Sequence, residues 1–369
     1  DSIMNGNPKW FEDLCNGIID RGYGDKITWG GNLRRMKPLA DIDTLRLYSR
    51  AGIEYMVTGM ESASESVLKH MKKNKNMKIV RKIFENIRQI NKEAGDKQND
   101  KIRVGFQGER GSYSEEATNS WIPNSNPLPY KTLEDLFGAL ENNEIHNAII
   151  PIENSIEGSV NEAYDLLLES SAKINGEINL KIKHCLIGHK GININEVESI
   201  YSHPQALGQC RKYIKKLNKE VIPTYDTAGS VKLIKEKEIK NGAAIASRKA
   251  AERYDMQVIE DRIGDSEDNY TRFFYLGKTN PLETGKDKTS IVFSTPDKSG
   301  SLYRVLEEFA KRNINLTKIQ SRPTRERVWE YNFFVDFEGH IMDNNCKKLC
   351  DSLLEMCKFV KVLGSYPRT

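Results

Sequence analysis

Short apolar runs alternate with helical patterns through the middle of the chain. The runs predict strands at residues 102–106, 148–152, 243–247 and 271–276, and one more that ends at residue 201. Helical spacing follows several of them, at residues 163–168, 203–207 and 248–254. Strands that alternate with helices predict an α/β fold with largely parallel sheets, in which ligands bind at the loops after the strands' carboxyl ends.

A different order begins near residue 288. Strands are expected at 289–294, 329–337 and 358–363, and amphipathic helices at 302–309 and 349–356. With a strand near residue 320, the order is βαββαβ over about 80 residues, which is typical of a ferredoxin-like domain. Before residue 96 the pattern predicts helices at 43–50 and 80–90 and a strand at 53–57, and the polar stretch 96–101 is the expected linker.

Composition narrows the class of protein. At about 150 residues per domain, 369 residues predict two to three domains. Apolar residues make up 38% and charged residues 29%, which excludes a disordered chain. Six cysteines are too few for a disulfide scaffold, so a reducing, cytoplasmic location is expected. No apolar run reaches the roughly 18 residues of a membrane span, so no membrane partner is expected.

The net charge of +4 is small and uneven, because the whole surplus lies in residues 1–100. Basic residues are interleaved with acidic ones and form no stripe, so no nucleic-acid partner is expected. The chain begins with Asp1 rather than Met, from which we expect a truncated or joined reading frame, or a fusion whose remainder lies upstream.

Four motifs in the middle stretch make residues 102–280 resemble prephenate dehydratases. They are GFQGERGSYS (105–114), PIENSIEGSV (151–160), YSHPQALGQC (201–210) and NYTRF (269–273). The resemblance implies two α/β lobes of the periplasmic-binding-protein kind, formed by residues 102–178 with 262–280 and by 179–261. It places the active site in the cleft between them. Prephenate loses its ring hydroxyl and a carboxylate, as CO2, and this chemistry needs no metal or redox cofactor.

The resemblance implies that Thr271 hydrogen-bonds the leaving hydroxyl. Its hydroxyl is a very weak acid, so we interpret it as a positioned donor. Asn154 and Gln209 match further positions of the family, and their amides donate hydrogen bonds without adding negative charge beside a dianion. Asn154 could equally cap a helix, and Gln209 could be a solvated helix residue. Glu153 needs a raised pKa to act as an acid there, and its role is left open.

A second group of residues is expected to bind the substrate. Four serines precede helices, where hydroxyls and backbone N–H groups suit a carboxylate or simply cap the helix. Arg272 could bind a carboxylate, but it alternates with Thr271 along the strand and could instead bridge the lobes in an ion pair. Phe273 could pack under the ring. With His203, which is as easily structural, the group is Ser112, Ser114, Ser155, Ser202, His203, Arg272 and Phe273.

Residues 288–366 resemble an ACT domain, a module that binds amino acids. The matching motifs are SGSL (299–302) and QSRP (320–323). The resemblance implies a phenylalanine site where the two motifs meet across a dimer interface, in a homodimer or homotetramer. Ser301 and Gln320 depart from the usual alanine and glutamate, so the strength of feedback is open, as is a role in dimerisation alone. The expected effector residues are Gly300, Ser301, Leu302, Gln320, Ser321, Arg322 and Pro323.

Residues 1–97 resemble part of a radical SAM barrel, through YMVTGMES (55–62) and SVLKHMK (66–72). The resemblance places Gly59 and Glu61 near the bound cofactor. An iron–sulfur cluster of that family needs three cysteines spaced C-x3-C-x2-C, whereas this stretch holds only Cys15, so no radical chemistry is expected. An all-helical chorismate mutase is the weaker alternative, because the strand at 53–57 argues against it.

These observations predict a prephenate dehydratase with a C-terminal ACT domain and no cofactor. An arogenate dehydratase remains an alternative, because its substrate differs only by an amine in place of the keto group. A catalytically silent amino-acid sensor is the other alternative. No metal is expected, because the cysteines and histidines show no ligand spacing.

Overall fold

The computed structural model describes residues 8–20, 29–32, 41–50, 53–57, 101–279, 281–324 and 330–368. Contacts divide the chain into two units, residues 1–100 and 101–369, and each is described by itself. No helix in the described ranges is long and apolar enough to cross a membrane.

The described residues of the first unit form two helices and a pair of parallel strands. They are α1 (Pro8–Asp20), β1 (Trp29–Asn32), α2 (Ile42–Arg50) and β2 (Ile53–Val57), and β1 pairs with β2. The predicted helix at 43–50 and strand at 53–57 are therefore confirmed. Burial raises the pKa of the Cys15 thiol to about 11, with the Glu12 carboxylate adding to the shift. The helix expected at 80–90, Gly59 and Glu61 lie outside the described residues.

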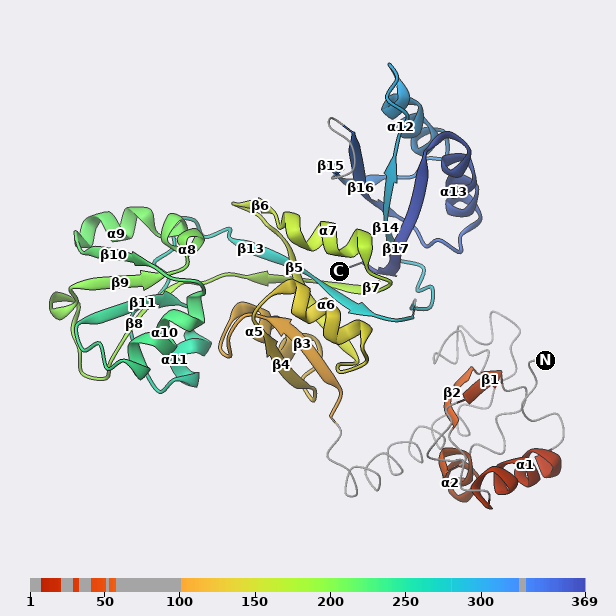
Figure 1. Cartoon of the computed structure of the whole chain (residues 1–369), viewed down its shortest axis with the longest axis horizontal. Helices are drawn as coiled ribbons and strands as arrows, with labels where there is room; N and C mark the ends of the chain where they lie inside the picture. Colours follow the sequence, from red (N-terminus) through yellow and green to blue (C-terminus); the bar gives the residue numbers. More distant parts are fainter. Residues whose placement is uncertain are drawn as a thin grey trace, which may run out of the picture. The chain divides into compact units, whose positions relative to one another are not determined.

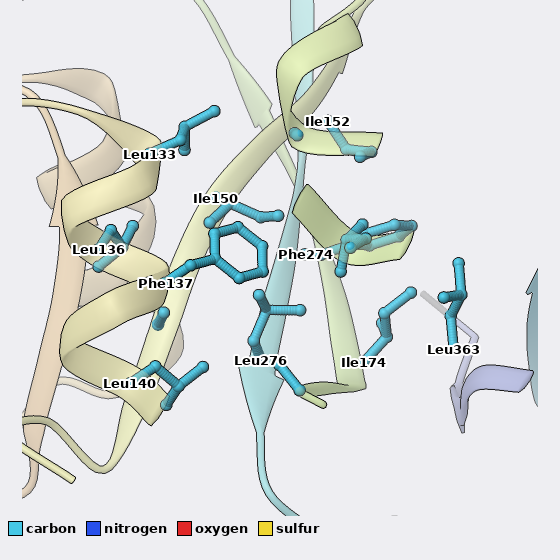
Figure 2. Packing of buried hydrophobic residues seen from close by; sticks show 14 of the residues in the cluster. Leu133, Leu136, Phe137, Leu140, Ile150, Ile152, Ile174, Phe274, Leu276 and Leu363 are labelled. Carbon is cyan, nitrogen blue, oxygen red and sulfur yellow. The ribbon is translucent and has the colours of Figure 1, made fainter. Parts of the chain in front are cut away.

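The second unit begins with a lobe built on one mixed sheet. Its main strands, in spatial order, are β4 (Asn126–Tyr130), β3 (Arg103–Gln107), β5 (Asn147–Asn154), β13 (Tyr270–Gly277) and β7 (Lys173–Lys181), with the short β6 (Gly158–Ser159) beside β5. The helices are α5 (Tyr113–Trp121), α6 (Leu133–Glu141) and α7 (Asn161–Glu169). Side chains of α6 such as Phe137 pack on Ile150, Leu276 and Phe274 of the sheet (Figures 1 and 2).

A second lobe holds five strands and four short helices. The strands, in spatial order, are β10 (Glu220–Pro223), β9 (Ser199–Ser202), β11 (Gly242–Ala246), β8 (Cys185–Gly188) and β12 (Gln257–Glu260). The helices are α8 (Pro204–Gln209), α9 (Arg211–Leu217), α10 (Thr227–Glu236) and α11 (Arg248–Arg253). Each strand and helix predicted from the apolar pattern in residues 102–276 corresponds to one of these elements.

The expectation of largely parallel sheets is wrong for half of the strand pairings. In the first lobe β3 is parallel to β4 and β5, but β13 is antiparallel to β5 and β7; in the second, β8 is antiparallel to β11 and β12. The cause is that the chain crosses between the lobes twice, so β13 returns to the first sheet from outside it (Figure 1). The two crossings bond to each other, Ile182 N–H to Asn269 O (2.8 Å) and Ile263 N–H to His184 O (3.0 Å).

The predicted βαββαβ order is confirmed in the last part of the chain. Its elements are β14 (Asp287–Ser294), α12 (Ser301–Lys311), β15 (Leu316–Pro323), β16 (Tyr331–Glu338), α13 (Asn344–Met356) and β17 (Phe359–Pro367), in an antiparallel sheet ordered β15-β16-β14-β17. Alternate strand residues such as Ile291 and Phe337 pack under α12 and α13.

The opposite face of this sheet packs on the first lobe. Phe334 and Tyr366 join the core of that lobe, where Phe334 makes an edge contact with Tyr164 and Tyr366 with Phe274. Lys361 of β17 donates to the carbonyls of Leu167, Leu168 and Ser170, and so covers the end of α7. Burial, followed by the nearby charge of Lys173, lowers the pKa of Lys361.

Candidate active site

A small cavity lies where the two lobes meet. It encloses about 90 Å3, and its walls come from the first lobe, the second lobe and the crossings between them. The lining residues are Tyr113, Asn154, Ile182, His184, His203, Gln205, Ala206, Gln209, Thr227 and Thr271. None of these ten residues is acidic, so the cavity is compatible with an anionic ligand.

Asn154 and Thr271 are direct partners in the β5–β13 ladder. Asn154 Nδ2 donates to Thr271 Oγ1 at 3.0 Å, to Asn269 Oδ1 at 2.7 Å and to the Tyr270 carbonyl at 3.1 Å. Its Oδ1 accepts from the backbone N–H groups of residues 156 and 157, so Asn154 also stabilises the turn after β5. Asn154 therefore lines the cavity and holds a turn, but it does not cap a helix, because α7 begins only at Asn161 after Val160.

The direction of the bond between Asn154 and Thr271 matters for chemistry. Because Thr271 Oγ1 accepts from an amide N–H, its own hydroxyl proton remains available for donation. Thr271 is β-branched and lines the cavity, so its hydroxyl occupies few rotamers, and one of them serves the cavity. The arrangement is that of a positioned hydrogen-bond donor.

Gln209 ends α8 and is buried, so the view of it as a solvated residue is wrong. Its Oε1 accepts from Asn269 Nδ2 at 2.9 Å and bonds His184 Nε2 at 2.8 Å, and its Nε2 lies 3.4 Å from Asn154 Oδ1. Gln209 therefore joins the second lobe to the Asn154–Thr271 pair of the first.

Three residues of this network were not predicted as site residues: Tyr113, His184 and Asn269. Burial lowers the pKa of His184, against the opposing effect of its bond to Gln209, so the ring is neutral and donates from Nε2. Its Nδ1 lies 3.0 Å from the Tyr113 hydroxyl. Asn269 falls within the NYTRF motif and could have been found there, whereas His184 stands alone before β8 without a recognisable spacing.

His203 lines the cavity and also begins α8. Its Nδ1 accepts from the Gln205 N–H at 3.3 Å, as a helix N-cap does. Its position is compatible with both the structural and the binding role considered for it.

The expected substrate-binding role of Arg272 is contradicted by the structure. Its side chain lies on the opposite face of β13 from Thr271, as strand alternation requires, and pairs with Glu177 (2.6 Å) and with Asp336 of β16 (2.7 Å). Glu153 alternates with Asn154 in the same way and pairs with Lys318 of β15 at 2.7 Å. Neither Arg272 nor Glu153 lines the cavity, so Glu153 is not placed to act as an acid there.

Phe273 and Ser202 are interior residues rather than binding residues. Phe273 is 1% exposed and packs with Ile149 and Ile178 in the sheet core, and Ser202 donates to the Ile245 carbonyl at 2.6 Å from a fully buried position. Both residues lie within a motif, yet their side chains are placed by long-range packing that the motif itself does not reveal.

The other three serines are also outside the cavity lining. Ser112 caps α5 by accepting from Glu115 N–H, Ser114 is buried within α5, and Ser155 donates to the Asp268 carbonyl and accepts from Tyr270 N–H. For Ser112 and Ser155 the capping or turn role explains the hydroxyl, so their expected contact with substrate is not supported by this geometry.

The two expected effector motifs lie on different elements: SGSL follows the inner strand β14 and opens α12, whereas QSRP lies in the edge strand β15. Gly300 adopts a φ of +78° before α12, Ser301 accepts from Arg304, and Leu302 of α12 packs against the core between helices and sheet. Gln320 Oε1 accepts from Ser159 of β6 at 3.0 Å, and Arg322 pairs with Asp165 of α7 at 2.8 Å. Pro323, which follows Arg322, lines a cavity of about 550 Å3, a volume typical of small-molecule sites, and Ser321 is not part of that lining.

Metal-ligand and thiol chemistry find no support in the part of the chain that the structure describes. No group of three or more His, Cys, Asp or Glu side chains there could hold a metal ion. Burial raises the pKa of Cys185 and of Cys210 to about 12, which keeps both thiols protonated near neutral pH.

Family comparisons identify two domains in the second unit. The family described as "Prephenate dehydratase" matches residues 104–281, and "ACT domain" matches residues 289–345. A prephenate dehydratase of Methanocaldococcus jannaschii is 40% identical over 266 residues, which cover 70% of this chain and 95% of that protein. The chain belongs to the prephenate dehydratase family.

Other relatives show how far the similarity extends. The chloroplastic arogenate dehydratase/prephenate dehydratase 2 of Arabidopsis thaliana is 40% identical, covering 72% of this chain and 73% of that one. Among solved structures, a prephenate dehydratase of Arthrobacter aurescens in complex with L-Phe has a TM-score of 0.67 and 29% identity over 72% of this chain and 90% of its own. A quorum-quenching acylase, GqqA, has a TM-score of 0.68 and 28% identity over 72% and 98%.

The lobes of this dehydratase-family chain are closed on one another. Glu109 of the glycine-rich loop accepts from the Tyr225 hydroxyl (2.9 Å) and pairs with Lys232 (3.1 Å), and Ser247 donates to the Gly111 carbonyl (2.7 Å). A 90 Å3 cavity is below the roughly 300–1,000 Å3 of typical ligand sites, so the lobes must separate to admit a ten-carbon substrate.

We predict that Gly111→Ala prevents this closure. A Cβ at Gly111 would lie 2.8 Å from Ala250 Cα of the other lobe, and the φ of +84° adds backbone strain. Dehydratase kcat/KM should fall at least about ten-fold, because closure excludes water and orders the site. Gly191→Ala is the control, since Gly191 has a similar φ (+88°) but open space around it. Equal loss in both variants would contradict the closure argument.

We predict that His184→Gln reduces the loss of stability at acid pH. The folded pKa of His184 is lowered, so below the unfolded value of about 6.5 the unfolded chain binds a proton that the folded chain does not. Stability therefore falls as pH drops through this range. In urea titrations at pH 7.5 and 5.5, the variant should gain on the wild type at the lower pH. The exposed His146→Gln should not, and a pH-independent difference for His184→Gln would count against the assignment.

Proposed function

We propose that this chain converts prephenate to phenylpyruvate. The observation that carries the proposal is the Asn154–Thr271 hydrogen bond in an interlobe cavity without acidic residues, in a chain of this family. Thr271 donates its hydroxyl proton in a hydrogen bond to the ring hydroxyl of the substrate as that group leaves. The C–O and C–CO2 bonds break, the electron pair of the C–CO2 bond enters the ring as CO2 leaves, and the hydroxyl departs with the C–O pair and takes one proton from solvent to become water.

The remaining residues supply binding and order. Gln209 Nε2 presents its second N–H to an anionic oxygen, Asn154 holds Thr271 through its own amide, and neutral His184 holds Gln209 in place without adding charge. Aromatisation supplies the driving force, so accurate positioning and a single hydrogen-bond donor account for the rate. The similar fold of a quorum-quenching acylase illustrates that fold alone does not define a reaction, so the proposal rests on these residues.

Phenylalanine is the proposed effector of the ACT domain. The Arthrobacter aurescens relative has been solved in complex with L-Phe, which supports this choice. Gln320 accepts a hydrogen bond from Ser159 and so retains one function of an acceptor at that position. We further propose that copies of the chain associate through the ACT and dehydratase domains, in a homodimer or homotetramer, and that the enzyme is cytoplasmic. A domain that serves dimerisation alone is the alternative.

The substrate assignment is tested by supplying the full-length protein with prephenate and with arogenate. We expect phenylpyruvate from prephenate at a higher kcat/KM than phenylalanine from arogenate, with added phenylalanine lowering the rate. A preference for arogenate would favour the second candidate function, an arogenate dehydratase. Relatives with that name are 38–39% identical to this chain. Turnover of neither substrate would contradict the proposal and favour a silent sensor.

Replacing Thr271 by Ala should lower kcat for prephenate by about 100-fold or more, since one positioned donor contributes about 10²–10⁴-fold. Thr271→Ser should retain part of the rate, because it keeps the hydroxyl but loses the methyl group that restricts its rotamers. Thr118→Ala removes a buried hydroxyl bonded to the Ser114 carbonyl, away from the cavity lining, and is the control. Near-normal turnover by Thr271→Ala would contradict the proposed role.

A further inference from the structure

Two successive rungs of the β5–β13 ladder serve two different parts of the molecule. The first rung pairs Asn154 with Thr271, whose side chains meet at the cavity. The next pairs Glu153 with Arg272, whose side chains point to the opposite face and contact the antiparallel C-terminal sheet. Both residues of the first rung, Asn154 and Thr271, are therefore covalently joined to a residue held by the ACT domain.

Arg272 is held by a dense set of charge-assisted bonds. Its Nε and Nη2 reach Glu177 Oε2 at 2.7 and 2.6 Å, and its Nη1 reaches Asp336 Oδ2 at 2.7 Å. Asp336 in turn accepts from Ser290 at 2.6 Å, and Tyr366 lies 3.1 Å from Arg272 Nη2. Asp336, Ser290 and Tyr366 all belong to the ACT sheet.

Glu153, the partner of Arg272 in this rung, is held more weakly, by the strand that carries the second effector motif. Lys318 of β15 pairs with Glu153 at 2.7 Å and donates to Ser159 at 3.3 Å, and Ser159 donates to Gln320 two residues further along β15. Glu153 is 35% exposed, so this pair is partly screened by solvent. A movement of β15 would act directly on the strand that carries Asn154.

Burial makes the Arg272 contacts rigid. Its side chain is 13% exposed, that of Asp336 8% and that of Glu177 1%, so any displacement leaves a charge without a partner in a medium of low polarity. Because the guanidinium is planar and bonds two carboxylates from different nitrogens, these bonds restrict its direction as well as its distance. An error of about 1 Å in a reacting group can cost about 100-fold in rate, so the position of β13 matters to the reaction.

We propose that Arg272 is a positioning residue through which the ACT domain orders Thr271. The ion pair between Asp336 and Arg272 carries the coupling, and the pair between Lys318 and Glu153 assists it from the neighbouring strand. Phenylalanine lowers the rate by displacing Asp336 and Lys318, and the ion pairs that these residues form transmit the movement to the Asn154–Thr271 rung. The inference rests on the proposed function and names the route by which its effector acts.

The test measures prephenate kcat and KM for the wild type and for Asp336→Asn, each with and without saturating phenylalanine. We expect kcat of the variant to fall about ten-fold while KM stays within about two-fold, because Arg272 keeps Glu177 and the cavity wall is unchanged. Phenylalanine should lower the wild-type rate by about 5-fold or more, but the variant's rate by less than about two-fold. The reason is that the substitution and the effector both act on the Asp336–Arg272 pair, so their effects are not additive.

Lys361→Met is the matched control, because Lys361 holds the ACT sheet to α7 rather than to β13 or β5. Its kcat and its response to phenylalanine should stay within about two-fold of the wild type. Lys318→Gln breaks the half-exposed pair and keeps the proposal testable if Asp336→Asn does not fold; it should lower the response to phenylalanine in the same direction.

The outcomes separate the two levels of the proposal. A wild type that does not turn over prephenate overturns the proposed function itself. An active wild type overturns the coupling route if it ignores phenylalanine, if Asp336→Asn keeps the full wild-type response, or if Lys361→Met loses the response equally. Loss confined to the Asp336 and Lys318 variants supports the route.

Discussion

The antiparallel pairing of β5 with β13 is the interaction on which the rest of the molecule depends. It brings together residues 154 and 271, which are 117 positions apart, and closes the first lobe after the chain has formed the second. Because strand residues alternate between faces, one register sets both the cavity residues and the residues that meet the ACT domain. A slip of one residue would exchange Thr271 for Arg272 in the cavity.

Polarity is distributed in the same two-sided way. The cavity face carries amides, hydroxyls and imidazoles that bond to one another, whereas the ACT face carries the carboxylates of Glu153, Glu177 and Asp336 with their cations. A dianionic substrate therefore meets donors without opposing negative charge in the lining, and the ionic groups serve to hold strands in place. Binding and positioning are assigned to opposite sides of one sheet.

The elements and the central site residues could be predicted because their signals are local. Apolar periodicity indicated the strands, and the motifs around Asn154, Gln209 and Thr271 marked the residues that the structure brings into one cavity. The antiparallel return of β13 was missed, because strand direction depends on where the chain re-enters the sheet. His184 was missed for a similar reason, since its importance comes from Gln209, 25 positions away, and from Tyr113, 71 positions away.

For Arg272, the direction of the side chain could be predicted from the sequence, whereas its ion-pair partner could not. Alternation along the strand already placed its side chain opposite Thr271, and this was the reason to consider an ion pair beside a role in binding. The partner could not be named, because Asp336 lies 64 positions away in a domain with its own core. Once that partner is known, the adjacency of Arg272 and Thr271 has a physical consequence. Arg272 does not face the cavity, but it links the ACT domain to the neighbouring residue that does.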